Sequence, residues 1–226
     1  VTNAPVIFLN SAIGDVGPRS NFILETGKFS AAGGDGIDAV REVGYRGASE
    51  ALHLFSRIDE LHDDWPLAVK CESQQYTHEP LADLDWARRR ADELYPRRAE
   101  GGVYTAEYLY YRAVIEAHKL PAQPGRTLEQ TVIAIGPVAI VPMPGEIFSE
   151  ITLRLRSYSP YRHTLCVSAA NDFWGYLVPQ SARFRPNYSV WMELAFGAYK
   201  PAHDIDDQLI AYTMRLLQRL AVNPNH

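Results

Sequence analysis

Residues 130–156 read QTVIAIGPVAIVPMPGEIFSEITLRLR, and this stretch decides the fold. Two apolar, β-branched runs lie on either side of a Gly-Pro pair at 136–137, which predicts a hairpin or two sequential strands. The second run ends at a Pro-Gly pair at 144–145, and apolar residues then recur at helical spacing as far as Leu155. A strand that passes through a tight turn into a helix is typical of layered α/β domains.

The same alternation of strands and helices continues on both sides of this stretch. Apolar runs predict strands, and apolar residues at spacings of three and four predict helices. We therefore expect an α/β fold, a layered domain with a mixed sheet flanked by helices, in which residues 1–226 belong to a single domain. The further predicted strands are 5–10, 66–76 and 163–169, and the further predicted helices are 37–55 (with Asp35 as N-cap), 80–95, 103–119 and 205–220.

The composition of the 226-residue chain is that of a globular protein without a basic surface. Hydrophobic residues make up 46% of the chain, which is enough to bury a substantial core. A formal net charge of -5 provides no basic field for a phosphate backbone, so nucleic acid is not an expected partner. No apolar run approaches the roughly 20 residues that cross a bilayer, so no transmembrane segment is expected.

The first residues, VTNAPVIFLN, lack the basic start and the long apolar core of a signal peptide. The chain begins with Val and enters an apolar run at once, as a cleaved product or a partial sequence does, so we expect it to be one of these. We expect a soluble protein, and the compartment stays open, with the cytoplasm favoured over secretion.

Cysteine and histidine, two common zinc ligands, show no metal-binding spacing here. Cys71 and Cys166 lie far apart and outside any C-x-x-C pattern, so we expect two buried free thiols. No histidines have the spacing H-x-H or H-E-x-x-H, and no Ser/His/Asp set is apparent. The seven histidines are His53, His62, His78, His118, His163, His203 and His226.

Three loops are predicted to follow strands, and they carry most of the candidate functional residues. They are SAIGDVGPR (11–19), PGE (144–146) and NDFWGY (171–176), and each combines glycine with polar or ionisable side chains. Ligands of α/β sheets bind at loops that leave the carboxyl ends of strands, so we expect these loops to line a site. Each loop alone is explained equally well by turn chemistry: Glu146 suits the first turn of a helix, and Tyr176 suits a core.

The three loops together resemble segments of the neutral ceramidase family. The run VAIVPMPGEIFSEITLRLR (138–156) resembles a family segment in which a strand delivers a P-G-E turn to a helix. AANDFWGYLVP (169–179) resembles the segment N-x-x-x-x-Y, and GDVGP (14–18) resembles the motif G-D-V-S-P. Residues 188–220 are similar to the closing helices of bacterial relatives, so the chain resembles the C-terminal part of the family's catalytic domain, without the upstream part.

This resemblance implies a zinc-dependent hydrolase that cleaves an amide (N-acyl) bond through a metal-activated water. In the family, two histidines, a glutamate and a tyrosine hold the zinc, and the glutamate falls on Glu146 and the tyrosine on Tyr176. Asp15, Gly17 and Asn171 fall in the implied active-site loops. The family's two histidines lie upstream of the G-D-V-S-P loop, so the resemblance implies that two histidines upstream of this chain complete the zinc site.

Two departures from the family pattern bear on the activity. The family serine that is proposed to take part in hydrolysis aligns with Gly17, which has no hydroxyl group, so the catalytic residue is unassigned. Ser11 and Ser20 lie nearby but out of register. Two ligands do not make a tight zinc site, so this chain alone is expected to bind zinc weakly or not at all.

Three interpretations follow. The first is an enzyme, completed by an upstream segment of the same protein or by a separate polypeptide, that acts on a small-molecule or lipid amide. The second is a catalytically degenerate relative that keeps the scaffold for ligand binding. The third interpretation is a sugar- or peptide-binding module built on the aromatic residues Trp174, Tyr188, Trp191, Phe196 and Tyr199.

The missing upstream part also bears on the behaviour of the isolated chain. A sheet without its preceding strands would expose an edge and an apolar face, so the isolated chain is expected to be a homo-oligomer or poorly soluble.

Overall fold

The computed structural model divides into two compact units, residues 1–15 with 66–226, and residues 16–65. The residues that it describes are 6–17, 22–23, 28–29, 36–122, 125–184, 187–197 and 199–222.

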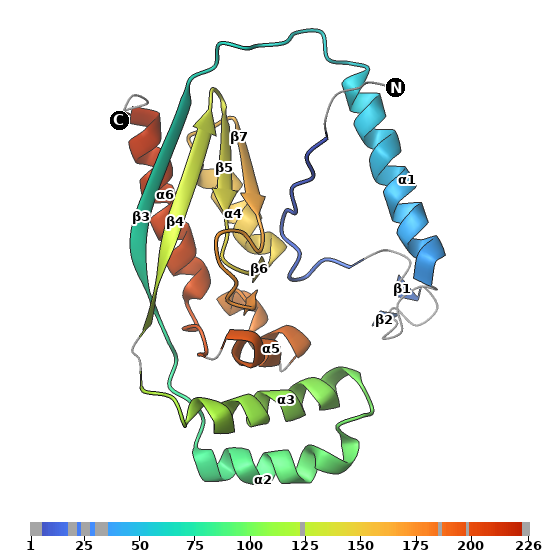
Figure 1. The fold of residues 1–226 in the computed structure, drawn as a ribbon, viewed down its shortest axis with the longest axis vertical. Coiled ribbons are helices and arrows are strands. Elements are labelled where there is room, and N and C mark those ends of the chain that lie inside the picture. The colour runs from blue at the N-terminus through green and yellow to red at the C-terminus, as the bar shows by residue number, and fades with distance from the viewer. Residues whose placement is uncertain are drawn as a thin grey trace. The chain divides into compact units, whose positions relative to one another are not determined.

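The larger unit is built on a mixed sheet of four strands (Figure 1). The order is β3-β4-β5-β7, in which β3 and β5 run antiparallel to β4, and β5 and β7 run parallel. Gly136 occupies the hairpin between β4 and β5 with a φ of 51°, a conformation that glycine adopts without strain. This sheet confirms the predicted α/β class. The strands are β3 (Leu67–Thr77), β4 (Gly125–Ile135), β5 (Val138–Pro142) and β7 (His163–Val167).

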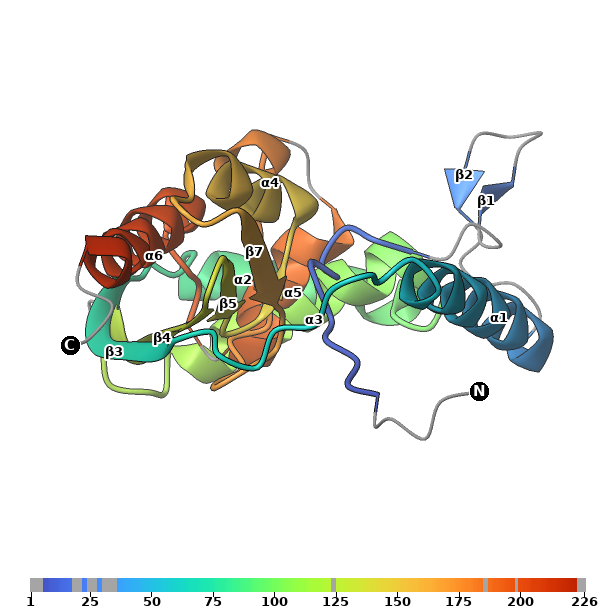
Figure 2. The ribbon, with the colours of Figure 1, turned by 90° about the horizontal axis from the view of Figure 1, so that it is seen from above.

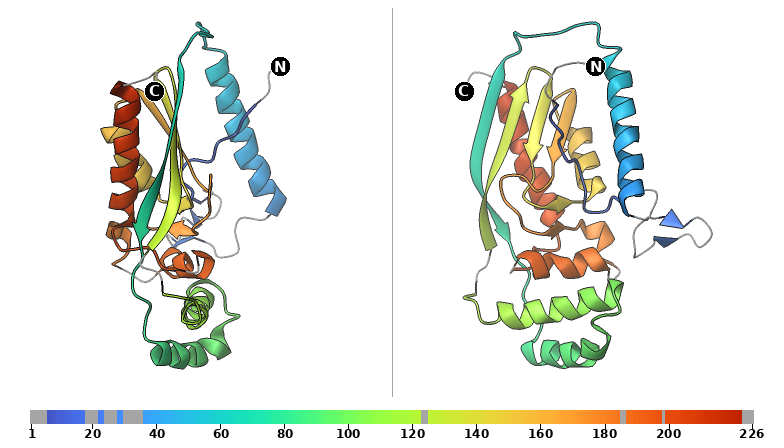
Figure 3. Two further views of the ribbon diagram at one scale, coloured as in Figure 1. Left: turned by 60° about the vertical axis from the view of Figure 1, so that its left-hand side comes forward. Right: turned by 45° about the vertical axis from the view of Figure 1, so that its right-hand side comes forward.

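Helices cover one face of this sheet and extend beyond one end of it. Helices α4 (Ser149–Tyr158) and α6 (Ile205–Val222) lie on the same face, as the left view of Figure 3 shows. Arg154 of α4 joins them by ion pairs with Asp206 and Asp207 of α6. The remaining helices of this unit are α2 (Leu84–Leu94), η2 (Tyr95–Arg97), α3 (Gly102–Ala117), η3 (Gln180–Ala182) and α5 (Tyr188–Gly197).

The sheet is apolar on both faces, but α4 and α6 cover one of them. Small and medium side chains of the covered face, such as Ala139 and Val141, are fully buried. Larger side chains point to the opposite face, where Leu67 is 66% exposed and Val69 and Leu165 are also exposed. Strands with apolar residues on both sides are typical of sheets that are buried between two layers. We call this second surface the open face; its half-buried members are Ile133, Ile135, Val138 and Ile140.

The open face also corrects the prediction for the cysteines. Cys166 is buried beneath α4 and α6 as expected, but Cys71 is exposed. Cys71 shares the alternation of Leu67 and Val69 along β3, which directs every second side chain to the open face.

The predicted strand 5–10 is wrong for the residues that the structure describes. Residues 6–10 are irregular, and Phe8 is 85% exposed. A strand needs a neighbour that accepts its backbone hydrogen bonds along its length. Within the described part of this run, Asn10 makes that kind of contact: its carbonyl accepts from Ser168 N at 3.0 Å, just beyond the end of β7.

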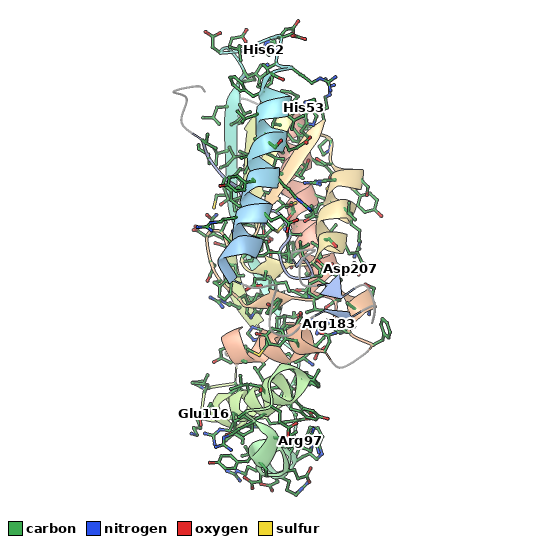
Figure 4. All side chains as sticks on the ribbon, turned by 90° about the vertical axis from the view of Figure 1, so that its right-hand side faces the viewer. His53, His62, Arg97, Glu116, Arg183 and Asp207 are labelled. Carbon is green, nitrogen blue, oxygen red and sulfur yellow. The ribbon has the colours of Figure 1, made fainter. Side chains whose placement is uncertain are left out.

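The smaller unit contains α1 (Gly36–Phe55) and the two-residue strands β1 (Phe22–Ile23) and β2 (Lys28–Phe29), which pair antiparallel. Helix α1 confirms the prediction for 37–55, while its predicted N-cap Asp35 lies outside the described residues. His53 and His62 lie at the end of α1 and in the segment beyond it (Figure 4). No helix among the described residues is long and apolar enough to cross a membrane.

Candidate functional site

The segments after β5 and β7 meet at one end of the sheet, because parallel strands end together. Figure 1 shows this end below β5 and β7, and Figure 2 looks along the strands with α4 and α6 on one side of the sheet. Backbone hydrogen bonds join residues 143–146 to residues 169–175. Ala169 N donates to Gly145 O at 2.9 Å, and Glu146 N donates to Gly175 O at 2.8 Å. The structure therefore brings together two of the three loops that the sequence singled out.

Glu146 and Tyr176 stand side by side within this arrangement. They are register partners in a two-residue parallel ladder between β6 (Glu146–Ile147) and β8 (Tyr176–Leu177). The backbones of the two segments approach so closely that a Cβ on Gly145 would lie 2.5 Å from Gly175 O. This close approach requires glycine at position 145.

The two side chains also interact with one another. Burial raises the pKa of the Tyr176 phenol, and the Glu146 carboxylate, which hydrogen bonds with the phenol, raises it further. The phenol is therefore protonated and donates to the carboxylate near neutral pH. The ring of Tyr188 meets the Tyr176 ring edge to face at a centroid distance of 5.9 Å. A carboxylate and a phenol oxygen thus face the same small volume.

Two residues of the third loop (11–19), Gly14 and Asp15, contact the segment that follows Glu146. Gly14 N donates to Ile147 O at 2.9 Å, and a Cβ on Gly14 would lie 2.5 Å from Glu146 O. The Asp15 carboxylate accepts two hydrogen bonds from Ser149, from the backbone N to Oδ1 and from Oγ to Oδ2, both at 2.7 Å. Asp15 therefore lies close to the pair in the fold, although its own hydrogen bonds go to α4.

Asn171 and Gly17, the other two predicted loop residues, have different settings. Asn171 has a φ of 68°, and its side-chain amide donates to Thr131 Oγ1 at 3.1 Å, which ties the loop to β4. Its neighbour Asp172 accepts two hydrogen bonds from Arg126 at 2.9 Å. Gly17 belongs to the smaller unit.

A buried pair of side chains behind β8, Glu193 and Arg183, was not predicted from the sequence. Glu193 of α5 is fully buried, and its Oε1 accepts from Val178 N at 3.1 Å and from Arg183 at 2.5 Å. Arg183, labelled in Figure 4, also donates to Val178 O at 3.0 Å, so both side chains hold the strand that carries Tyr176. A glutamate inside the apolar helix sequence VWMELAF was the signal that could have revealed this pair.

The buried Glu193 should make stability depend on pH. Desolvation raises its pKa from 4.5 to about 8, although Arg183 opposes this increase. A carboxyl group whose pKa is raised on folding stabilises the folded state at pH values below its pKa in the unfolded state. This stabilisation is lost as the pH rises through its pKa in the folded state. We expect the free energy of unfolding, measured by urea titration, to fall between pH 4.5 and about 8. Glu193→Gln should flatten this dependence, and an unchanged slope would contradict the assignment.

The aromatic residues of the third interpretation do not form one surface. Trp174 is fully buried; its Nε1 donates to Tyr199 O at 3.2 Å, and its ring contacts Tyr76 and His78. Tyr188 is exposed and Trp191 is half-buried. The side chain of Phe196 lies outside the described residues. The expectation of an aromatic surface that includes Trp174 is therefore wrong, because Trp174 belongs to the core.

The adjacent oxygen atoms of Glu146 and Tyr176 are of a kind that zinc sites use. A carboxylate and a phenolate are hard oxygen ligands, and their adjacency at 146 and 176 fits one side of a zinc site. In the described part of the chain, however, no group of three His, Cys, Asp or Glu side chains could hold a metal ion. Zinc sites have three or four protein ligands, so this pair fits such a site only when further ligands join it.

A groove of about 800 Å³ lies elsewhere, between α3 and α5. Its lining includes Leu109, Leu120 and Met192, with Arg112 and Lys119 among its charged residues. Neither Glu146 nor Tyr176 lines it, so we place the candidate site at the pair on the basis of its chemistry.

Comparison with solved structures gives the fold a relative. The crystal structure of neutral ceramidase from Pseudomonas aeruginosa is similar over 94% of this chain and 37% of that chain, with a TM-score of 0.53 and 15% identity. A structure of a ceramidase complexed with C2 is similar over 42% of this chain and 15% of that chain, with a TM-score of 0.32 and 17% identity. The chain thus spans just over a third of the P. aeruginosa enzyme, with which it shares a fold. No family model and no curated protein matches the sequence.

Proposed function

We propose that this chain is part of a zinc-dependent hydrolase related to the neutral ceramidases, in which Glu146 and Tyr176 are two of the zinc ligands. The observation that carries the proposal is the register pair of these residues. The sequence resemblance selected both residues independently, from segments 30 positions apart by their numbering. The shared fold with a neutral ceramidase supports the same assignment.

The chemistry of the pair suits a metal site that further ligands complete. The Tyr176 phenol keeps its proton beside Glu146, because burial and the carboxylate both raise its pKa. Glu146 and Tyr176 would hold the zinc, and a divalent cation near the phenol would favour its phenolate form. When bound, zinc would supply an activated water for the hydrolysis of an amide. The residues of this chain hold the ion and orient it.

The remaining two ligands, histidines by the family resemblance, would come from polypeptide outside this chain. An upstream segment of the same protein, or a separate polypeptide, is therefore the proposed partner. The substrate class that follows is a small-molecule or lipid amide. Gly17 has no hydroxyl to contribute, so the proposed hydrolysis depends on the metal-activated water alone.

The alternative is a catalytically degenerate relative that keeps the scaffold for ligand binding. Gly17 in place of the family serine favours it. So does the observation that, among the residues that the structure describes, no group of three His, Cys, Asp or Glu side chains could hold a metal ion.

Zinc content separates these two functions. We expect elemental analysis to find about one zinc per molecule in a polypeptide extended upstream of Val1, and far less in the 226-residue chain, because two ligands bind zinc weakly. Both proteins should be purified in the same buffer and dialysed against the same chelating resin. If the extended polypeptide holds no zinc, the scaffold interpretation replaces the hydrolase.

A further inference from the structure

We infer that Asp15 is a positioning residue for Glu146. Its carboxylate holds the backbone that follows Glu146, so that the Glu146 side chain stays beside the Tyr176 phenol. The effect on Glu146 and Tyr176 follows from the geometry, whereas the effect on metal binding rests on the proposed function.

Glu146 is constrained from two directions. On one side, its N–H donates to Gly175 O in the strand that carries Tyr176. On the other side, Gly14 and Asp15 hold two of the next three residues, through Gly14 N to Ile147 O and through the Asp15 carboxylate to Ser149. Without the second set of bonds, the turn from β6 into α4 would be held at one end.

Asp15 does the work of a helix cap from a distant part of the chain. Helix α4 begins at Ser149, and its own N-cap residue Phe148 offers no side-chain hydrogen bond. The first N–H groups of a helix need acceptors, and a carboxylate there also suits the positive end of the helix dipole. Asp15 supplies that carboxylate, so the start of α4 depends on a residue more than 130 positions away.

The contacts favour positioning over substrate binding. Both Asp15 oxygens accept hydrogen bonds from the same residue, Ser149, at 2.7 Å. The neighbouring Gly14 allows this approach, because a Cβ there would lie 2.5 Å from Glu146 O. Residues 14 and 15 are therefore shaped to contact the Glu146 turn itself.

Asp83 provides a matched control. It caps α2, where its Oδ1 accepts from Trp86 N at 2.8 Å, and it is the same residue type in the same capping role. Helix α2 packs in a separate apolar cluster that includes Ala87, Leu94 and Val114. Asp83→Ala should therefore remove a helix cap without disturbing the Glu146 turn.

The first test uses the NMR signals of the Tyr176 ring in the tyrosine-labelled 226-residue chain, assigned by their loss in Tyr176→Phe. Glu146→Gln sets the reference shift for a changed Glu146 neighbour. We expect Asp15→Ala to move the Tyr176 signals in the same direction, and Asp83→Ala to leave them in place. If Asp15→Ala leaves the Tyr176 signals at their wild-type positions, the inference is overturned.

The second test measures the zinc dissociation constant of the extended polypeptide by competition with a chromophoric chelator. Asp15→Ala should weaken zinc binding by about 10- to 100-fold, the range for residues that orient metal ligands. Asp15→Asn should restore most of the affinity, because its carbonyl can accept from Ser149 N and its amide can donate to Ser149 Oγ.

Asp83→Ala should lower the melting temperature to a similar extent as Asp15→Ala and leave the zinc affinity unchanged. Equal zinc affinities for these two variants would show that Asp15 only caps helix α4, and this result would overturn the inference. If the wild-type extended polypeptide binds no zinc, the proposed function fails, and the Tyr176 signals alone decide the role of Asp15.

Discussion

In the extended polypeptide, Glu146→Ala is expected to remove zinc almost completely, from about one ion per molecule to less than about a tenth. The reason is that the proposed four-ligand site would lose its only carboxylate, and with it one of the two negative charges that balance the cation. Tyr176→Phe keeps the ring in its half-buried place and removes the phenol oxygen, so it should also weaken binding, by at least the roughly 100-fold upper range for indirect positioning residues. Elemental analysis and chelator competition measure both effects.

Two neighbouring residues make matched controls for this prediction. Glu150→Gln alters a carboxylate in the first turn of α4, and Tyr188→Phe alters the phenol that meets Tyr176 edge to face. Both variants should keep stoichiometric zinc. A zinc content that is unchanged in Glu146→Ala would show that the metal, if bound, is held elsewhere.

Trp174→Ala is expected to cause the largest loss of stability, about 3–5 kcal/mol, which is the usual cost of truncating a buried tryptophan. Trp174 is fully buried, and its backbone N donates to Pro144 O at 2.6 Å. Its ring packs against Tyr76 and His78, so alanine would leave a large cavity next to the turn that carries Glu146. Urea-induced unfolding followed by far-UV circular dichroism measures the loss.

Trp86→Ala is the control for this measurement. Trp86 is 42% exposed on α2 and contacts Tyr111 edge to face. It should cost less than half as much as Trp174→Ala, because much of its surface already faces water. Equal losses for the two variants would show that Trp174 does not lie at the centre of the core.

The elements that the sequence predicts best are those whose apolar spacing comes from burial. Strand β5 and helix α6 were predicted almost to their ends, since the β5 run is apolar throughout and α6 carries one apolar stripe. Strand β4 begins at Gly125, earlier than the apolar run that starts near residue 130. Its first residues are largely polar and pair with β3 through the backbone, and backbone pairing leaves no trace in hydrophobicity.

The candidate site was predictable as a set of residues but not as a geometry. Motifs singled out Glu146 and Tyr176, yet their direct register depends on a ladder of two residues, which is too short to show any periodicity. The bond from Asp15 to Ser149 and the Glu193–Arg183 pair join residues that are neighbours only in three dimensions. Residue type and spacing carry no information on such contacts. The roles of Glu146, Tyr176 and Asp15 in metal binding stay predictions.

The open face of the sheet bears on the fate of the chain inside a cell. Leu67, Val69 and Leu165 present there the kind of surface that nascent and partly folded proteins show to chaperones. A polypeptide that keeps such a surface uncovered is continuously bound, refolded or degraded, and its abundance then follows quality control more than synthesis. Whatever covers this face would therefore protect the protein from degradation. The cellular level of the protein would then depend on the fraction of molecules in which the open face is covered.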